Sequence, residues 1–339
     1  MTVPRSVSDA LASWCYPVKN VEPMVGGGVN QHFRVETDSG DLGVLRRYNP
    51  RHPAESTSYE HSVLRHLEGL GWPVAAPLPT PTMQYVIETD EGRWSLFPFL
   101  FGSPPPSRDP LFLQRKGVLL ALVQRDLTSW ESPAQRPGFG RVTDLDTPLR
   151  SSGFEGFDAL IDELRRSDAT RAEALYALRE SNRETLGRRG YGELADWTVW
   201  YECLGNNILF TEDNVTGLLD FDFAHRDARV ADAARSLVVD CGTDTTLISR
   251  WLAGYATFSD PSLSIVEADL IPDLMLASAI WNAVVPLSIA ASGGPAWMLE
   301  SARRDIDEVL PRLRDAVPGL RYVTRAAAGL SQRSDPPSP

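Results

Sequence analysis

The sequence has little cysteine and histidine for its length, and this limits the kinds of site it can hold. Its 339 residues include three cysteines and five histidines. Cys15, Cys203 and Cys241 are odd in number and widely spaced, so neither a disulfide framework nor a zinc site is expected. No histidine is paired with cysteines or carboxylates at metal-ligand spacing, and there is no G-x-S-x-G elbow. We expect all five histidines to be structural or to lie on the surface.

Basic residues are also in deficit. The chain has 33 Lys and Arg against 45 Asp and Glu, a net charge of −12. Binding to a phosphate backbone needs clustered Lys and Arg, so nucleic acid is excluded as the main partner. A hydrophobic content of 42% and a charged content of 23% are typical of a globular protein with one large or two ordinary domains.

Long apolar runs are almost absent. The start, MTVPRSVSDALASW, has no charged segment followed by an apolar one, so we expect no signal peptide. The best membrane candidate is residues 274–291, LMLASAIWNAVVPLSIAA, which contains Asn282 and Pro286. We expect a buried core helix with a kink or break near Pro286, no membrane contact and a cytoplasmic location.

The first hundred residues have the pattern of a β-rich domain. Residues 23–35 hold a Gly-rich stretch, which fits a turn between two strands, followed by an alternating run, and further strand-like runs lie over 42–48, 84–88 and 94–100. A polar turn containing Gly40 joins the first two strands as a hairpin. Gly102 and the three prolines that follow it indicate a linker, so we place the first domain at residues 1–102.

One helix is predicted inside this domain, after the second strand. Thr57 and Glu60 have the spacing of a capping box, and Val63 and Leu67 belong to its apolar stripe. Glu60 is equally suited to orient Arg46, which lies on the preceding strand. The residues alone leave these two roles of Glu60 open.

Beyond the linker the pattern is mostly helical. Helices are predicted over residues 113–127, 157–164 and 171–186, and a β-like island over 195–224 interrupts them. A Ser- and Pro-rich end predicts a disordered tail over 326–339, which leaves 103–325 as the second domain. A β-rich lobe followed by a helical lobe with an embedded hairpin is the plan of a two-lobed kinase. We therefore predict an α+β, bilobal protein-kinase-like fold with an antiparallel-sheet N-lobe and a mainly helical C-lobe.

The island carries a motif. Its sequence, WYECLGNNILFTEDNVTGLLDFDFA, resembles the aminoglycoside phosphotransferases, choline kinases and type II homoserine kinases. That family carries His-Gly-Asp, four residues, Asn and an apolar pair, and later an apolar run ending in Ile-Asp-Phe/Trp. Asn207 and Asp220 match the asparagine and the second aspartate, and Glu202 stands at the family's Asp-to-Asn spacing. GGGVNQHFRV, VLRRY and GRWSLFPFL are also similar, most of all to the type II homoserine kinases.

The resemblance implies phosphoryl transfer from ATP or GTP, with Mg²⁺, to a hydroxyl of a small molecule. Asn207 and Asp220 would hold the metal, and Glu202 would orient the hydroxyl. Nucleotide-binding candidates are Gly27, Gly28, Asn30, Arg46, Glu60, Phe97 and Phe99. Taken alone, the glycines fit an ordinary hairpin turn equally well, and Arg46 stands where a kinase places its phosphate-binding lysine.

The acceptor is less defined. Asp222, Trp281 and Asn282 are the candidates, and a wall of acidic and aromatic residues would suit an amine-bearing molecule. Antibiotic resistance and natural-product tailoring are roles suggested by analogy.

The departures from the family concentrate in one loop. Trp200-Tyr201-Glu202 replaces His-Gly-Asp, and Gln124 stands in place of a histidine. The additional methylene of glutamate moves its oxygens by about 1 Å or more unless the backbone compensates. Glu202 is then a working base, or nucleotide and metal bind while chemistry is slow, or the loop is reassigned in a pseudokinase with a ligand or protein partner. We favour the phosphotransferase. In the family, a patch of acidic and basic residues after the second aspartate braces the catalytic loop. We interpret the corresponding residues here as structural: Asp227, Arg229, Asp232 and Arg235.

Overall fold

The computed structural model describes residues 5–24, 30–40, 42–50, 53–106, 108–131 and 135–330. These residues form two compact units. The first comprises Met1–Pro104 and Asn207–Asp220, and the second comprises Pro105–Asn206 and Phe221–Pro339. The segment Asn207–Asp220, which we placed in the second domain, thus makes its contacts in the first unit. Domain boundaries at residues 102 and 325 stay a prediction.

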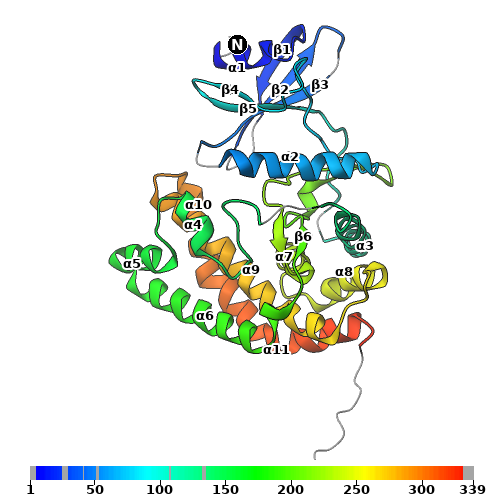
Figure 1. Ribbon diagram of the computed structural model, residues 1–339. Helices are drawn as coiled ribbons and strands as arrows, with labels where there is room; N and C mark the ends of the chain where they lie inside the picture. The colour runs from blue at the N-terminus through cyan, green and yellow to red at the C-terminus, as the bar shows by residue number, and fades with distance from the viewer. Residues whose placement is uncertain are drawn as a thin grey trace, which may run out of the picture. The chain divides into compact units, whose positions relative to one another are not determined.

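The first unit contains a five-stranded antiparallel sheet in the order β1-β2-β3-β5-β4 (Figure 1). Its strands are β1 (Val18–Pro23), β2 (Gln31–Thr37), β3 (Leu42–Arg47), β4 (Ile87–Thr89) and β5 (Gly92–Pro98). Within the segment 23–35, β1 ends at Pro23 and β2 begins at Gln31, so two strands flank the glycine-rich stretch. The glycines Gly27 and Gly28 lie outside the described residues.

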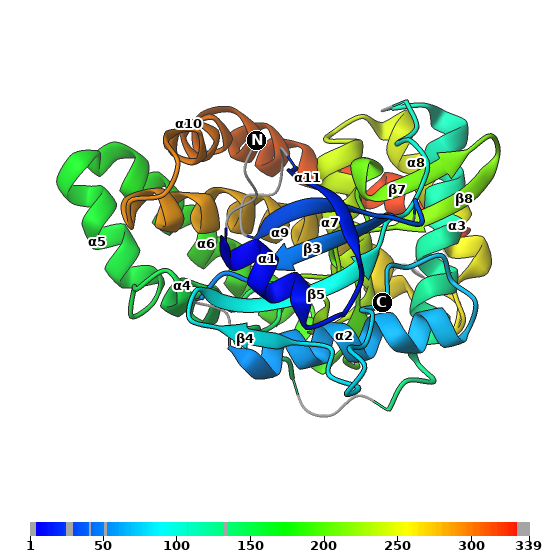
Figure 2. The ribbon, with the colours of Figure 1, turned by 90° about the horizontal axis from the view of Figure 1, so that it is seen from above.

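Two helices cover opposite faces of this sheet (Figures 1 and 2). Helix α1 (Arg5–Ala12) packs Val7 and Leu11 into a core with Leu45 and Leu96 of the sheet. Successive strand residues point to opposite faces, so Arg46 lies on the other face, where α2 (Ala54–Gly69) runs. Helix α1 was not predicted from the sequence.

Helix α2 begins earlier than the spacing of Thr57 and Glu60 predicts. Its N-cap is Pro53, with φ of −59° and no side-chain capping bond. The fixed φ of proline suits a helix start, so Thr57 falls inside the helix and the predicted capping box is wrong. The Glu60 side chain is directed to Arg46 instead.

The hairpin of the island belongs to the first unit. Strands β7 (Ile208–Thr211) and β8 (Asn214–Leu218) pair with Ile208 opposite Leu218. Bridges from Leu218 to Val74 and from Phe210 to Ser103 attach the hairpin to this unit. Strand β8 ends at Leu218, whereas the strand-like pattern of the sequence continues to residue 223.

The second unit is mainly helical (Figure 1). Its helices are α3 (Pro110–Leu127), α4 (Asp146–Ser151), α5 (Phe157–Ser167), α6 (Ala169–Arg188), α7 (Arg229–Asp240), α8 (Thr245–Phe258), α9 (Ile265–Ala291), α10 (Ala296–Arg304) and α11 (Leu310–Ala327). A π-helical turn, Asp305–Val309, joins α10 to α11. Strand β6 (Trp197–Val199) pairs with β9 (His225–Asp227), a strand that we did not predict. The sheet-bearing and helical units confirm the predicted α+β fold.

Helix α9 is the core of the second unit and packs against α6, α7, α10 and α11. Within the described ranges, it alone is long and apolar enough to cross a membrane, but 61% of its most apolar window is buried among other residues. The prediction of a buried core helix is confirmed. The helix continues through Pro286 to Ala291, so it does not break there. A cytoplasmic location stays a prediction.

Helix α11 ends at Ala327, close to the predicted boundary at residue 325. Residues 331–339 lie outside the described part of the chain.

Candidate active site

The altered loop, Trp200-Tyr201-Glu202, follows β6 in the second unit and is buried at all three positions. Its backbone is fixed by one carboxylate of α7. Asp232 accepts the N–H of Trp200 on one oxygen and that of Tyr201 on the other, both at 2.9 Å. The interpretation of Asp232 as a brace for this loop is therefore supported by direct contacts.

Gln124 supports the same brace. Its Nε2 donates to Asp232 Oδ2 at 3.2 Å and to the Arg229 carbonyl at 3.0 Å. Tyr255 donates to the Gln124 side-chain oxygen at 2.7 Å, which sets the orientation of the amide. Burial raises the pKa of Asp232 to about 6, against the lowering effect of these hydrogen bonds.

Tyr201 stands at the family's glycine position and adopts a left-handed backbone with φ of +67°. Glycine enters this region without steric penalty, whereas a residue with a Cβ is disfavoured by roughly 1 kcal/mol or more. The loop thus keeps a glycine-type conformation with a bulky aromatic residue in it, and the surroundings of Tyr201 must stabilise it.

The Glu202 carboxylate is held by α7. Arg235 Nη2 lies 2.7 Å from Glu202 Oε1, and the two side chains are only 8% and 9% exposed. Trp200 stacks on Phe221 with ring centroids 4.8 Å apart and planes inclined by 5°. The residue that replaces the family's histidine is therefore stacked on a neighbouring ring.

A second buried pair anchors the end of the loop. Lys116 on α3 forms an ion pair with Asp240 at the end of α7. Asp240 also accepts the N–H of Gly205 at 3.3 Å, and Ser236 donates to the Cys203 carbonyl at 2.8 Å. Burial raises the pKa of the Cys203 thiol, so this cysteine is an inert core residue.

In the first unit, the structure brings three predicted nucleotide-binding residues together. Arg46 Nη1 lies 2.6 Å from Glu60 Oε1, so the ion pair expected between them is present. The Arg46 guanidinium also lies over the Phe97 ring, 4.8 Å from its centroid. Arg47, on the opposite face, contacts Trp94 and Glu91 instead.

The other two described residues of the predicted nucleotide-binding set have different contacts. Phe99 contacts Phe101, with centroids 5.2 Å apart, and Arg34. Asn30 is buried and its side-chain oxygen accepts the N–H of Asn49 at 3.0 Å.

Asn207 and Asp220 flank the open end of the β7–β8 hairpin. The first strand pair is Ile208 with Leu218, and the Leu219 N–H donates to the Asn207 carbonyl at 2.8 Å. Asp220 is exposed and has φ of +62°, a conformation that aspartate tolerates better than most residues. Local strand pairing therefore places an amide and a carboxylate, both oxygen donors, at the same end of one hairpin.

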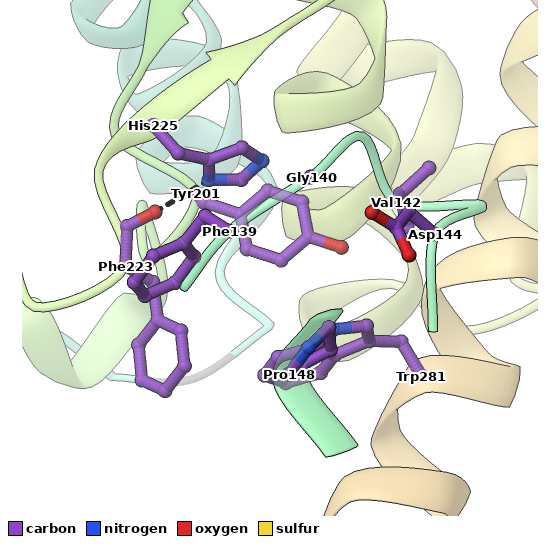
Figure 3. A pocket seen from close by; sticks show the side chains of 9 residues that line it. All are labelled: Phe139, Gly140, Val142, Asp144, Pro148, Tyr201, Phe223, His225 and Trp281. Atoms are coloured by element: carbon purple, nitrogen blue, oxygen red, sulfur yellow. Dashed lines mark hydrogen bonds between the residues drawn. The ribbon is translucent and has the colours of Figure 1, made fainter. Parts of the chain in front are cut away.

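Five aromatic rings of the second unit form a closed circuit around a small cavity (Figure 3). Each ring contacts the next at centroid distances of 4.9 to 5.9 Å, in the order Phe139, Phe223, Trp281, Tyr201, His225 and back to Phe139. The cavity holds about 10 Å³, room for one water-sized group. Asp144 also lines it, and the Tyr201 hydroxyl is directed to the side where Asp144 lies.

Two buried polar atoms of this circuit have no hydrogen-bond partner within the described part of the chain: the Tyr201 hydroxyl and Nε2 of His225. His225 Nδ1 donates to the Phe223 carbonyl at 2.6 Å, because a carbonyl can only accept. Nε2 of the same ring lies 3.9 Å from Oδ2 of Asp227.

The residues predicted to bind the phosphoryl acceptor do not all lie in one place. Trp281 is part of the circuit, whereas Asn282 lines a different cavity of about 370 Å³ that Pro286 and Asp305 also border. Asp222 is buried in the second unit and lines neither cavity.

Sequence reasoning missed Phe139, Asp144 and Phe223, and it assigned His225 to the structural residues. These residues come from segments far apart in the chain, so no local spacing marked them. Gly140 was a usable signal: a Cβ on it would lie 2.1 Å from the Asp144 carboxylate, so only glycine allows this close approach.

Comparison with known proteins agrees with the predicted resemblance. Residues 20–264 match the phosphotransferase enzyme family. A homoserine kinase from Rhodopseudomonas palustris (strain BisA53) is 26% identical over 261 residues, which cover 75% of this chain and 74% of that protein. An amicoumacin kinase in complex with AMP-PNP and Ca²⁺ has a TM-score of 0.68 at 12% identity, over 94% of each chain. A choline kinase from Streptococcus pneumoniae has a TM-score of 0.63 at 12% identity, over 93% of this chain and 98% of that one.

Proposed function

Because this chain belongs to the phosphotransferase enzyme family, we propose that it transfers the γ-phosphoryl group of ATP to a hydroxyl of a small, amine-bearing molecule. The observation that carries the proposal is the Glu202 carboxylate, buried and 2.7 Å from Arg235 in a loop whose amides Asp232 fixes. A carboxylate oriented in this way is suited to accept a hydroxyl proton. GTP stays an alternative donor.

In the proposed reaction the acceptor oxygen attacks the γ-phosphorus while Glu202 takes its proton. The new O–P bond forms as the bond from the γ-phosphorus to the β,γ-bridging oxygen breaks, and ADP leaves. Arg46, oriented by Glu60, would pair with the phosphates. Positioning and charge stabilisation, rather than covalent chemistry of the protein, then account for most of the rate.

The residues proposed for the metal fit Mg²⁺. The Asn207 amide and the Asp220 carboxylate offer hard oxygen donors, which Mg²⁺ prefers. No group of three or more His, Cys, Asp or Glu that could hold a metal occurs in the described ranges. That suits an ion which completes its shell with water and phosphate oxygens. When bound, the ion would neutralise charge on the phosphates.

The aromatic circuit supports an amine on the acceptor. Ring faces attract a cation, and the Asp144 carboxylate would pair with it. The cavity of about 10 Å³ suits an ammonium group, which is close to water in size, better than a trimethylammonium group. The Tyr201 hydroxyl lies on the same side of the cavity as Asp144 and is a further acceptor for its N–H groups.

The test begins with calorimetric titration of the protein with Mg-ATP and Mg-GTP, followed by transfer assays with homoserine, ethanolamine and choline. We expect Mg-ATP binding and turnover of at least one primary amine, with choline a poorer substrate. Glu202→Gln should abolish transfer and leave Mg-ATP affinity within about twofold. Wild-type turnover by Glu202→Gln would overturn the assignment of the base, and nucleotide binding without any turnover would favour the pseudokinase.

The amine site has its own test. Asp144→Asn should raise KM for the primary amine by about tenfold or more while KM for Mg-ATP stays unchanged, because the charge pair with the ammonium group is lost. Gly140→Ala should act in the same direction, since its Cβ would displace the Asp144 carboxylate. An unchanged KM for the amine in both variants would remove the aromatic circuit from the acceptor site.

A further inference from the structure

The guanidinium of Arg235 is enclosed by three side chains, two of which come from the altered loop. Its Nη2 lies 2.7 Å from the Glu202 carboxylate. Its central carbon lies 5.4 Å from the centroid of the Tyr201 ring and 5.2 Å from that of Trp281. The two rings meet edge to face, with centroids 5.9 Å apart. The guanidinium therefore lies against two aromatic rings that also contact each other.

This arrangement gives a reason for the unusual residue at position 201. A left-handed backbone disfavours a tyrosine, yet the Tyr201 ring forms one of the two walls that hold Arg235. A glycine would relieve the backbone and remove the wall. The ring of Tyr201 and the carboxylate of Glu202 thus converge on the same cation from neighbouring positions in the loop.

The contact also matches the length of glutamate. An aspartate at position 202 would end about 1.5 Å earlier, the length of one C–C bond. On the same backbone, its oxygens would lie beyond hydrogen-bond distance from Arg235. A buried arginine without its partner is strongly unfavourable, so the shorter side chain would not fit this loop.

We propose that Arg235 is a positioning residue that fixes the Glu202 carboxylate, with Tyr201 and Trp281 as its walls. The loop has accordingly been rebuilt around a glutamate, and restoring the family's aspartate does not restore a better catalyst. The inference rests on the proposed phosphoryl transfer for its kinetic consequences, but its structural content can be measured without turnover.

The kinetic test compares Glu202→Asp and Arg235→Ala with the wild type, using Mg-ATP and homoserine or ethanolamine, whichever is turned over. We expect both variants to lower kcat by at least tenfold while KM for Mg-ATP changes by less than twofold. Methylguanidinium in the buffer should restore part of the kcat of Arg235→Ala, because it can occupy the space between the two rings. A purely structural role would not produce this rescue.

Arg321→Ala is the control. Arg321 lies on α11 and donates from Nη2 to both carboxylate oxygens of Asp273 at 2.8 Å, so it is an arginine–carboxylate pair away from the loop. This variant should lower the melting temperature and leave kcat within twofold. A Glu202→Asp variant as active as the wild type, or an Arg235→Ala variant with unchanged kcat, would overturn the proposal.

A double-mutant cycle of thermal unfolding separates this inference from the proposed function. Glu202→Gln, Arg235→Ala and the double variant are compared by melting temperature. The two residues are coupled if the double variant is no less stable than Arg235→Ala alone. Such coupling supports the positioning contact even if the wild type transfers no phosphate to any acceptor tried. Additive shifts would overturn the inference even if the wild type proves to be an active kinase.

Discussion

Arg46 Nη1 lies 2.6 Å from Oε1 of Glu60, which links the third strand of the sheet to the helix on one of its faces. Glu60 is almost fully buried, so the arginine is its counter-charge as well as a group suited to phosphate. The neighbouring Arg47 lies on the other face of the same strand and is about a third exposed. The two arginines therefore form a natural comparison.

Arg46→Met should weaken Mg-ATP binding by about ten- to a hundredfold, because a charged hydrogen-bond partner of the phosphates is lost. Arg47→Met should leave the affinity within about twofold. Calorimetric titration at a temperature where both variants are folded measures the difference. Equal effects of the two substitutions would contradict the assignment of Arg46 to the phosphates.

Asp220→Asn and Asn207→Ala should raise the Mg²⁺ concentration needed for half-maximal ATP binding by about tenfold, since each removes or weakens an oxygen ligand. Asp213→Asn, at the exposed turn of the same hairpin, is the control and should have no such effect. The measurement is an ATP-binding titration at several Mg²⁺ concentrations. If Asp213→Asn shifts the Mg²⁺ dependence as much as Asp220→Asn, the effect is one of general charge and the ligand assignment is wrong.

Asp232 should make stability depend on pH. Burial raises the pKa of its carboxyl to about 6 in the folded protein, above the ordinary value of 3.8. Between these values the folded state binds this proton more tightly than the unfolded state does. The contribution of Asp232 to the free energy of unfolding therefore falls as the pH rises from about 4 to about 6.

Asp232→Asn removes this contribution. Urea unfolding at several pH values from 4 to 6 should show a free energy that decreases less with rising pH in the variant than in the wild type. Asp162→Asn, at an exposed position of α5, should retain the wild-type dependence. Identical pH dependence of Asp232→Asn and the wild type would show that the buried carboxyl does not titrate in this range.

Lys116→Met should destabilise the protein by roughly 3–5 kcal/mol, because it leaves the Asp240 carboxylate without its buried counter-charge. Arg108→Met breaks an exposed pair with Asp244 and should change stability by about 1 kcal/mol or less. Chemical denaturation of both variants checks the contrast. A loss below about 1 kcal/mol for Lys116→Met would mean that Asp240 is adequately solvated without the lysine.

Local sequence signals were sufficient for the parts of the molecule whose geometry is local. Asn207 and Asp220 were identified by the family resemblance of a short contiguous motif, which folds as a single hairpin with Ile208 opposite Leu218. The sequence left two roles of Glu60 open, and the structure shows the pair with Arg46, the arginine that strand alternation directs to the following helix. Where local signals competed, as at Thr57 against Pro53, the sequence pattern misplaced the start of the helix.

The sequence by itself determined the family resemblance, the α+β fold and the departure of Trp200-Tyr201-Glu202 from the family's His-Gly-Asp motif. Only the tertiary structure decided which residues contact these three side chains. The packing of α7 against the loop brings Arg235 to Glu202 across 33 positions of sequence, and α9 adds Trp281 as the second wall. No spacing encodes such contacts, because burial and helix packing select the partners of a buried charge after distant segments have come together.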